Sequence, residues 1–233
     1  MINREKLFYF DCEWVPVTEN LMNLKLDYPL LEEAFTHQCE KWDAEFIRNG
    51  AIKKKGEGLW WEEKAHFYPE FCKIICVSYG FFNKGEFIVK SLYGDNEKKL
   101  LTSIPDLFGK VEKLGFTLCG YAIKRFDMPW LSKRLMANGI QPPKILCMYG
   151  KKPWEIEVFD LPEVWGQGNM QESFTPFELA CAAVGMKSSK GDLSGSKVKE
   201  AYWNGQLERI KTYCELDVTK TMELATKLIE LLP

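Results

Sequence analysis

The chain has 233 residues, of which 46% are hydrophobic and 14% aromatic, and its formal net charge is −2. This composition can fill one sizeable core and excludes a disordered chain. The absence of a basic excess argues against a domain that holds long duplex DNA by its phosphates, but not against an enzyme that grips a few terminal nucleotides. With no signal-peptide pattern and no apolar run of about 18 residues, we expect a soluble cytoplasmic protein that binds no membrane.

The first strand is predicted over residues 6–12, where a continuous apolar run is typical of a strand covered on both faces. Residues 15–70 then form an inserted segment, with helical character at 30–48 and a basic loop at 53–58. Tryptophans flank that loop, and such a mixture can stack bases and hold phosphates. A small core of the segment's own explains the tryptophans equally well.

The rest of the chain alternates between strand and helix patterns. Strands at 71–82 and 86–92 are joined by a turn that indicates a hairpin, and a helix at 97–114 ends before Gly115. Further strands are predicted at 116–120 and 155–161, and further helices at 128–138, 176–184, 196–203 and 207–231. This order predicts an α/β fold in which helices flank a mixed five-stranded sheet, as a single domain over residues 1–233.

The cysteines do not show the spacing that is typical of a zinc site. The chain has eight of them without a C-x-x-C pair, and its histidines are only His37 and His66. Zinc ligation requires cysteines and histidines clustered at short spacing. We therefore expect free thiols buried in the core of an intracellular protein.

Two carboxylates follow the first apolar run, at Asp11 and Glu13. Side chains alternate along a strand, so both acids project from the same face. Buried like charges repel each other, and a core strand carries them when a cation compensates. A strand that ends in solvated acids is the alternative, but two acidic motifs downstream favour half of a metal site.

The second acidic motif is Asp127, which follows a strand and opens a helix. A carboxylate there also suits the positive end of a helix, so capping is an alternative role. The third motif places Tyr213 and Asp217 four residues apart in the last helix, and both therefore point from one face. For this motif alone, an exposed aspartate is the alternative.

Together, the three motifs resemble those of the DEDD superfamily of 3′–5′ exonucleases, and Tyr213 ahead of Asp217 resembles its DEDDy branch. The chain is similar to stand-alone predicted exonucleases related to the proofreading domain of family B DNA polymerases. The resemblance covers essentially the whole chain, with supporting matches at 68–76, 126–129, 158–161 and 190–195. It implies an RNase H-like fold.

The resemblance also implies a metal-dependent chemistry. Two divalent cations, Mg²⁺ or Mn²⁺, would be held by the carboxylates of Asp11, Glu13, Asp127 and Asp217. Tyr213 would position the attacking water. The implied activity is release of nucleoside 5′-monophosphates from the 3′ ends of single-stranded DNA, in replication, repair or proofreading with proteins of those processes as partners. An RNA exonuclease and a weakly active nucleic-acid-binding module of a replication complex are the alternatives.

One position departs from the resemblance. Many relatives carry asparagine five residues before the second aspartate, whereas this chain has Ala122. We expect activity to survive, because the acids are intact, but contacts to the substrate are expected to change. Asp160 either supports the site or caps a turn. The candidate substrate-binding residues, each of which also has an ordinary structural explanation, are Trp14, Lys124, Phe126 and Lys190.

Overall fold

The computed structural model describes residues 2–168, 175–187 and 193–233. The chain divides into two compact units, one formed by Met1–Glu13 with Ile74–Pro233 and the other by Trp14–Lys73. The single domain over residues 1–233 stays a prediction. In the part of the chain that the structure describes, no helix has the length and apolar character needed to cross a membrane.

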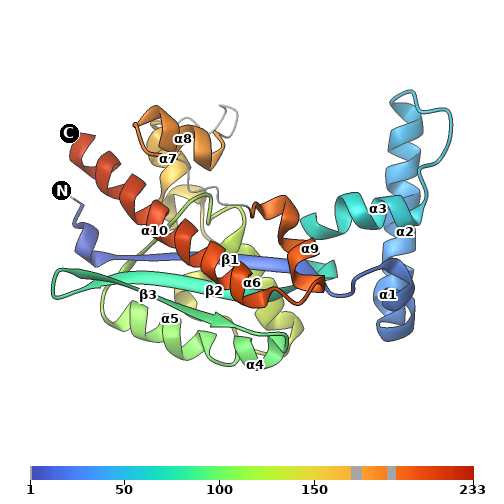
Figure 1. The fold of residues 1–233 in the computed structure, drawn as a ribbon, viewed down its shortest axis with the longest axis horizontal. Coiled ribbons are helices and arrows are strands. Elements are labelled where there is room, and N and C mark those ends of the chain that lie inside the picture. The colour runs from blue at the N-terminus through green and yellow to red at the C-terminus, as the bar shows by residue number, and fades with distance from the viewer. Residues whose placement is uncertain (1, 169–174, 188–192) are drawn as a thin grey trace. The chain divides into compact units, whose positions relative to one another are not determined.

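The centre of the fold is a mixed sheet of five strands in the order β3-β2-β1-β4-β5 (Figure 1). The strands are β1 (Leu7–Pro16), β2 (Cys72–Asn83), β3 (Glu86–Tyr93), β4 (Thr117–Gly120) and β5 (Val158–Asp160). β4 pairs in parallel with both β1 and β5, whereas β2 and β3 are antiparallel. The predicted α/β fold with a mixed five-stranded sheet is therefore confirmed.

The β2–β3 hairpin closes through a tight turn, as predicted. Asn83 pairs with Glu86, and the two residues between them, Lys84 and Gly85, have φ angles of 53° and 84°. Positive φ at both central positions matches the right-handed twist of the flanking strands. β1, in contrast, does not end at Cys12 as predicted, and its extended backbone continues to Pro16.

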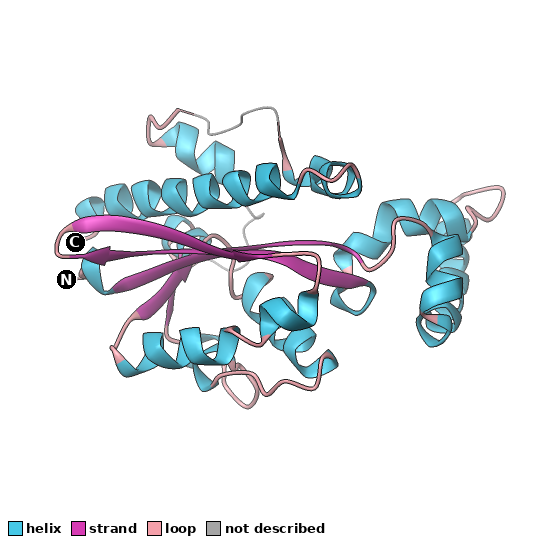
Figure 2. Ribbon diagram, turned by 60° about the horizontal axis from the view of Figure 1, so that its bottom comes forward, coloured by secondary structure: helices cyan, strands magenta, loops and turns pink. Residues whose placement is uncertain are grey.

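Helices cover both faces of the strands in the first unit (Figure 2). They are α4 (Glu97–Leu101), α5 (Ile104–Lys113), α6 (Asp127–Ala137), α7 (Leu161–Trp165), α8 (Phe177–Ala183), α9 (Val198–Trp203) and α10 (Leu207–Leu231). The prediction of one helix over 97–114 was wrong, because the segment divides into α4 and α5. Pro105 explains the break, since it has no amide hydrogen for the carbonyl of Leu101 and its ring would clash with it.

The two faces of β1 pack against different helices. Leu7 and Tyr9 belong to a buried cluster with Val218 and other residues of α10. Phe8 and Phe10 point the other way and contact the Phe108 ring of α5, with ring centroids 5.7 and 5.4 Å apart. Odd-numbered residues of β1 therefore lie on the α10 side of the sheet.

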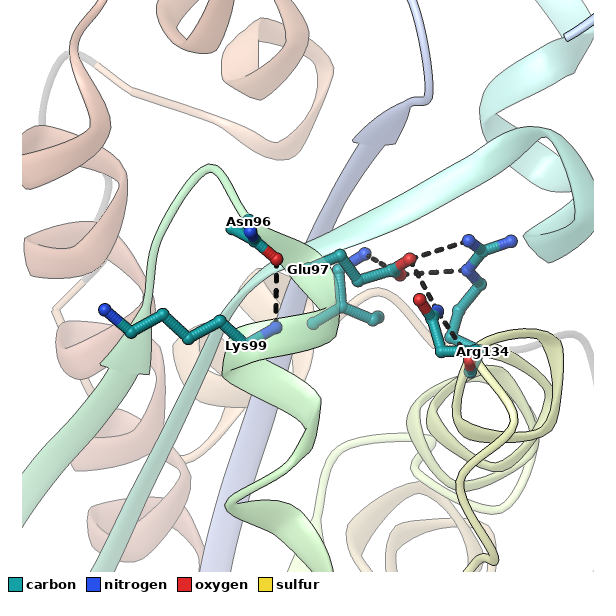
Figure 3. A network of polar contacts seen from close by, with 6 residues as sticks. Asn96, Glu97, Lys99 and Arg134 are labelled. Carbon is teal, nitrogen blue, oxygen red and sulfur yellow. Dashed lines mark hydrogen bonds and ion pairs between the residues drawn. The ribbon is translucent and has the colours of Figure 1, made fainter.

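A buried ionic junction fixes α6 to the sheet (Figure 3). Glu97, at the start of α4, accepts a hydrogen bond of 2.7 Å from the backbone amide of Ile74 in β2. Its carboxylate also accepts from the Arg134 guanidinium, at 2.9 and 2.6 Å, and from the Asn138 amide at 2.9 Å. Because three elements meet at one carboxylate with several partners, the junction holds the helix that begins with Asp127.

The second unit has its own core around α1 (Leu21–Asp27), α2 (Pro29–Arg48) and α3 (Glu57–Lys64). Trp42, Trp60 and Trp61 are buried in it. The Asp43 carboxylate accepts hydrogen bonds from the Trp60 indole at 2.8 Å and from the Lys55 amide at 2.9 Å. Burial of these tryptophans agrees with the structural alternative, a small core of the segment's own.

Candidate active site

The first two acids lie on the side of β1 that faces α10. Asp11 and Glu13 continue the alternation of Leu7 and Tyr9, and both are partly buried. The pair was expected at the end of a strand, but it lies within β1 because that strand continues beyond it. Position within the strand fixes the backbone on both sides of each acid.

α10 brings a thiol against this pair. The Cys214 Sγ donates to the Asp11 Oδ2 at 3.3 Å and to the Asp11 carbonyl at 3.5 Å. Asp11, Glu13 and Cys214 place their potential ligand atoms within 4.8 Å of one another. Tyr213 and Asp217 lie one residue before and three residues after Cys214 in the same helix, and the charge of Asp217 acts on both Asp11 and Glu13.

Asp127, the second acidic motif, contacts the same part of β1. It is the first residue of α6, is buried, and accepts a 2.9 Å hydrogen bond from the Cys12 backbone amide. Cys12 stands between Asp11 and Glu13, so this bond ties the second motif to the first. The carboxylate is thus held by the sheet, which a purely capping role would not require.

Burial raises the pKa values of these acids, and neighbouring acids of the cluster raise those of Asp11 and Glu13 further. Burial, followed by the charges of Asp127, Glu13 and Asp217, raises the pKa of Asp11 well above its usual range. Burial and the charge of Asp217 do the same for Glu13. Burial also raises the pKa of Asp127 to about 7. Buried acids this close together destabilise the fold unless a cation compensates their charge. Their ligand atoms are carboxylate oxygens, which suit a hard divalent ion.

Tyr213 stays protonated in this environment. Burial raises the pKa of its hydroxyl, and the neighbouring Asp217 raises it further by its charge and by a side-chain hydrogen bond. A phenol in this state can donate a hydrogen bond but is a poor general base. Tyr213 is therefore suited to orienting a group beside Asp217.

The loop that leads to Asp127 is held by a buried aspartate at the end of β5. Asp160 accepts hydrogen bonds from the backbone amides of Ile123, at 3.2 Å, and Lys124, at 3.1 Å. This agrees with the turn-capping alternative for Asp160. The first residue of the turn, Ala122, has a φ of 62°, a left-handed conformation that is unfavourable for alanine.

Replacing Ala122 by glycine should stabilise the protein. Glycine adopts a positive φ without steric cost, whereas alanine loses about 1–2 kcal/mol there. The larger conformational entropy of glycine in the unfolded chain and the loss of the buried Ala122 methyl group offset most of this gain, so we expect the free energy of unfolding to rise by no more than about 0.5 kcal/mol. Urea unfolding of Ala122→Gly measures it, with Ala182→Gly in helix α8 as a control that should lose stability. A loss of stability in Ala122→Gly would contradict strain at this turn.

Three of the four candidate substrate-binding residues have contacts of their own within the protein. Trp14 belongs to the second unit, where its indole nitrogen donates to the His66 carbonyl at 3.1 Å. The Lys124 ammonium forms an ion pair of 2.6 Å with Glu163. The partly buried Phe126 ring lies 5.2 Å from the Arg125 guanidinium carbon. Lys190 lies outside the described residues.

Sequence reasoning missed Cys214, which it treated as one of several core thiols. Its spacing could have indicated a place in the site. Residues three apart on a helix are neighbours, and Cys214 precedes Asp217 by three. The bond from the Cys12 amide to Asp127 carried no sequence signal, since it depends on how α6 meets β1.

Removing the Cys214 thiol should weaken cation binding. The thiol is a hydrogen-bond donor to Asp11, and loss of a group that orients a metal ligand typically costs 10–100-fold in metal affinity. Cys214→Ala is therefore expected to lower Mn²⁺ affinity, measured by calorimetry, about tenfold or more. Cys214→Ser keeps a hydrogen-bond donor and should keep most of the wild-type Mn²⁺ affinity. Cys119→Ala, which removes a fully buried thiol from β4, should bind Mn²⁺ as the wild type does. Equal affinity in Cys214→Ala would show that the thiol only fills space.

Two comparisons relate the chain to known proteins. The family model described as a predicted 3′–5′ exonuclease related to the exonuclease domain of PolB matches residues 65–229. Among solved structures, the family B DNA polymerase from the hyperthermophilic archaeon Pyrobaculum calidifontis matches with a TM-score of 0.54 and 18% sequence identity. The match covers 96% of this chain and 24% of the polymerase, so it shows a common fold over part of a much longer protein. No curated protein matches the chain.

Proposed function

Because the chain belongs to the family of predicted 3′–5′ exonucleases related to the exonuclease domain of PolB, we propose that it degrades single-stranded DNA from the 3′ end. Each cycle would hydrolyse the terminal phosphodiester and release a nucleoside 5′-monophosphate. The proposed setting is DNA replication or repair in the cytoplasm, with proofreading as one such role.

The observation that supports this activity is the convergence of acids from distant parts of the chain. Asp11 and Glu13 come from β1, Asp127 from the start of α6 and Asp217 from α10. Burial raises the pKa values of the first three, and the charges of neighbouring acids of the cluster raise those of Asp11 and Glu13 further, as expected of a carboxylate cluster that binds cations. Carboxylate oxygens suit Mg²⁺ and Mn²⁺, which we propose as the cofactors.

Each residue of the cluster has a distinct part in the proposed reaction. Two divalent cations, when held by the four carboxylates, would supply an activated water and stabilise the leaving 3′ oxygen. Cys214 holds the Asp11 carboxylate through its thiol, and the Cys12 amide holds that of Asp127. Tyr213, kept protonated, would orient the attacking water by hydrogen bonding.

The direct test uses single-stranded DNA labelled at its 5′ end. With Mg²⁺ or Mn²⁺ we expect a ladder of products that shorten from the 3′ end, together with free nucleoside 5′-monophosphates, and no products in EDTA. A matched RNA of the same sequence tests the alternative substrate. Cleavage that is unaffected by EDTA, or none in either metal, would contradict the proposal.

A further inference from the structure

Two large aromatic side chains project into solvent between α6 and β5. The exposed fractions are 95% for Tyr149 and 76% for Trp154. Lys151 and Lys152 lie between them and are also exposed. We call these four residues the aromatic–basic segment. Tyrosine and tryptophan normally bury most of their rings, so two that are this exposed are available to a ligand.

The backbone of this segment is ordered by local hydrogen bonds. The Lys151 amide donates to the Met148 carbonyl at 3.2 Å, which closes a turn that carries Tyr149. The Lys152 amide donates to the Glu155 carboxylate at 2.8 Å, and the Glu155 amide donates to the Lys152 carbonyl at 2.9 Å. The second pair of bonds encloses Trp154. Both rings are therefore presented on fixed turns, which lowers the entropy that binding would cost.

The segment is attached to the elements that position Asp127. The Lys124 ammonium donates to the Pro153 carbonyl at 3.4 Å, and Lys124 lies in the loop that leads to Asp127. On the other side, the Ser132 hydroxyl of α6 donates to the Leu146 carbonyl at 3.4 Å. Pro153 lies between Lys152 and Trp154, and Leu146 precedes Tyr149 by three residues, so the two bonds connect the chain around the aromatic–basic segment to the loop before α6 and to α6 itself. A nucleic-acid single strand bound at the segment would thus lie next to α6 and to the loop that leads to Asp127.

The charge of this region suits a polyanion. Residues 144–155 contain Lys144, Lys151 and Lys152 against one acid, Glu155, although the whole chain has a net charge of −2. The Lys152 ammonium lies 5.4 Å from the centroid of the Trp154 ring. Exposed aromatic rings next to cations are the usual means by which proteins hold single strands without regard to sequence, by stacking bases and pairing with phosphates.

We propose that the aromatic–basic segment binds the single-stranded nucleic acid whose 3′ end reaches the carboxylates. Bases stack on Tyr149 and Trp154, and Lys151 and Lys152 pair with the phosphates between them. The inference rests on the proposed function, because it assumes that the substrate is a single strand. Since the segment contacts the strand away from the reacting phosphate, it contributes equally to the ground state and the transition state, and so affects KM and not kcat.

Binding is tested first without catalysis, by fluorescence anisotropy of labelled single-stranded DNA and RNA oligonucleotides in EDTA. Trp154→Ala is expected to raise the dissociation constant about tenfold, in line with the loss of one stacked base. Trp154→Phe should recover most of the affinity. Joint replacement Lys151→Glu and Lys152→Glu should weaken binding and reduce its dependence on salt. Two control variants change similar residues elsewhere. Lys113→Glu changes an exposed lysine at the end of α5, Leu114→Ala changes the exposed apolar residue after it, and both should bind as the wild type does.

Catalysis provides the second readout. In Trp154→Ala, KM for a long oligonucleotide should rise about tenfold while kcat stays unchanged, and hydrolysis of a dinucleotide should stay at the wild-type rate. Wild-type affinity and KM in both the Trp154 and the lysine variants would overturn the inference, as would a wild type that binds no single strand. A wild type that binds through Trp154 but never cleaves would instead refute the proposed function and leave this inference intact.

Discussion

Replacement of Asp11 by asparagine is expected to lower the rate of 3′–5′ cleavage at least about 10³-fold. Asparagine has the same shape but no charge, and a metal ligand that stabilises charge in the transition state contributes several kcal/mol, where 1.36 kcal/mol equals a factor of ten. The charges of Asp127, Glu13 and Asp217 all raise the pKa of Asp11, so this carboxylate interacts with each of the other three. The measurement is kcat/KM on 5′-labelled single-stranded DNA in Mn²⁺.

Three companion variants make this result specific. Asp217→Ala should lose activity as severely as Asp11→Asn, whereas Tyr213→Phe should lose less, since it removes a hydrogen bond and no cation ligand. Asp106→Asn, at an exposed aspartate in the first turn of α5, should keep wild-type activity. All variants are compared after circular dichroism shows an intact fold. Undiminished cleavage by Asp11→Asn would refute the assignment of this site.

The second large effect concerns stability without metal. In EDTA, we expect the free energy of unfolding to fall by a few kcal/mol as the pH rises from about 5 to 8. The pKa of Asp127 is raised to about 7 in the folded protein, and those of Asp11 and Glu13 are also raised, whereas an unfolded aspartate titrates near 3.9. The unfolded chain therefore loses these protons first, so increasing pH favours unfolding until the folded acids have ionised as well.

A divalent cation should reverse this trend. Because the cation binds the folded carboxylates, Mn²⁺ at a hundred times its dissociation constant should add about 2.7 kcal/mol at pH 8. In Asp11→Asn, the fall of stability with pH should be shallower and the response to Mn²⁺ smaller. Urea unfolding over this pH range, with and without Mn²⁺, measures both effects. Stability in EDTA that rises from pH 5 to 8 would contradict the repulsion among the acids.

The sequence predicted the sheet and its helices well where the pattern was strong. Alternation and turn chemistry located the hairpin at Lys84 and Gly85, and α10 was predicted with the bounds it has. The break between α4 and α5 could have been predicted from Pro105, because proline has no amide hydrogen to continue the helix. The continuation of β1 beyond Cys12 was missed, because the two acids were taken as the end of the strand although Trp14 and Val15 are residue types that strands favour.

The candidate site, too, could be predicted only in part. Motif order was enough to propose which acids meet, because each stands at the end or on one face of a predicted element. What holds those acids was beyond the sequence. The bond from the Cys12 amide to Asp127 joins residues 115 positions apart, and the bond from the Cys214 thiol to Asp11 joins residues 203 positions apart. Such contacts follow from the packing of α6 and α10 on β1. The left-handed backbone of Ala122 was hidden for a similar reason, since it depends on the hydrogen bonds that the turn donates to Asp160.

The bond between Cys214 and Asp11 also has a consequence for synthesis on the ribosome. Its two partners are 203 residues apart, so Asp11 emerges long before the helix that completes its surroundings. At about 5–20 residues per second, the nascent chain carries an incomplete carboxylate cluster for tens of seconds. Until α10 emerges and packs, that chain lacks Tyr213, Cys214 and Asp217, and we expect it to be unable to attack nearby nucleic acid.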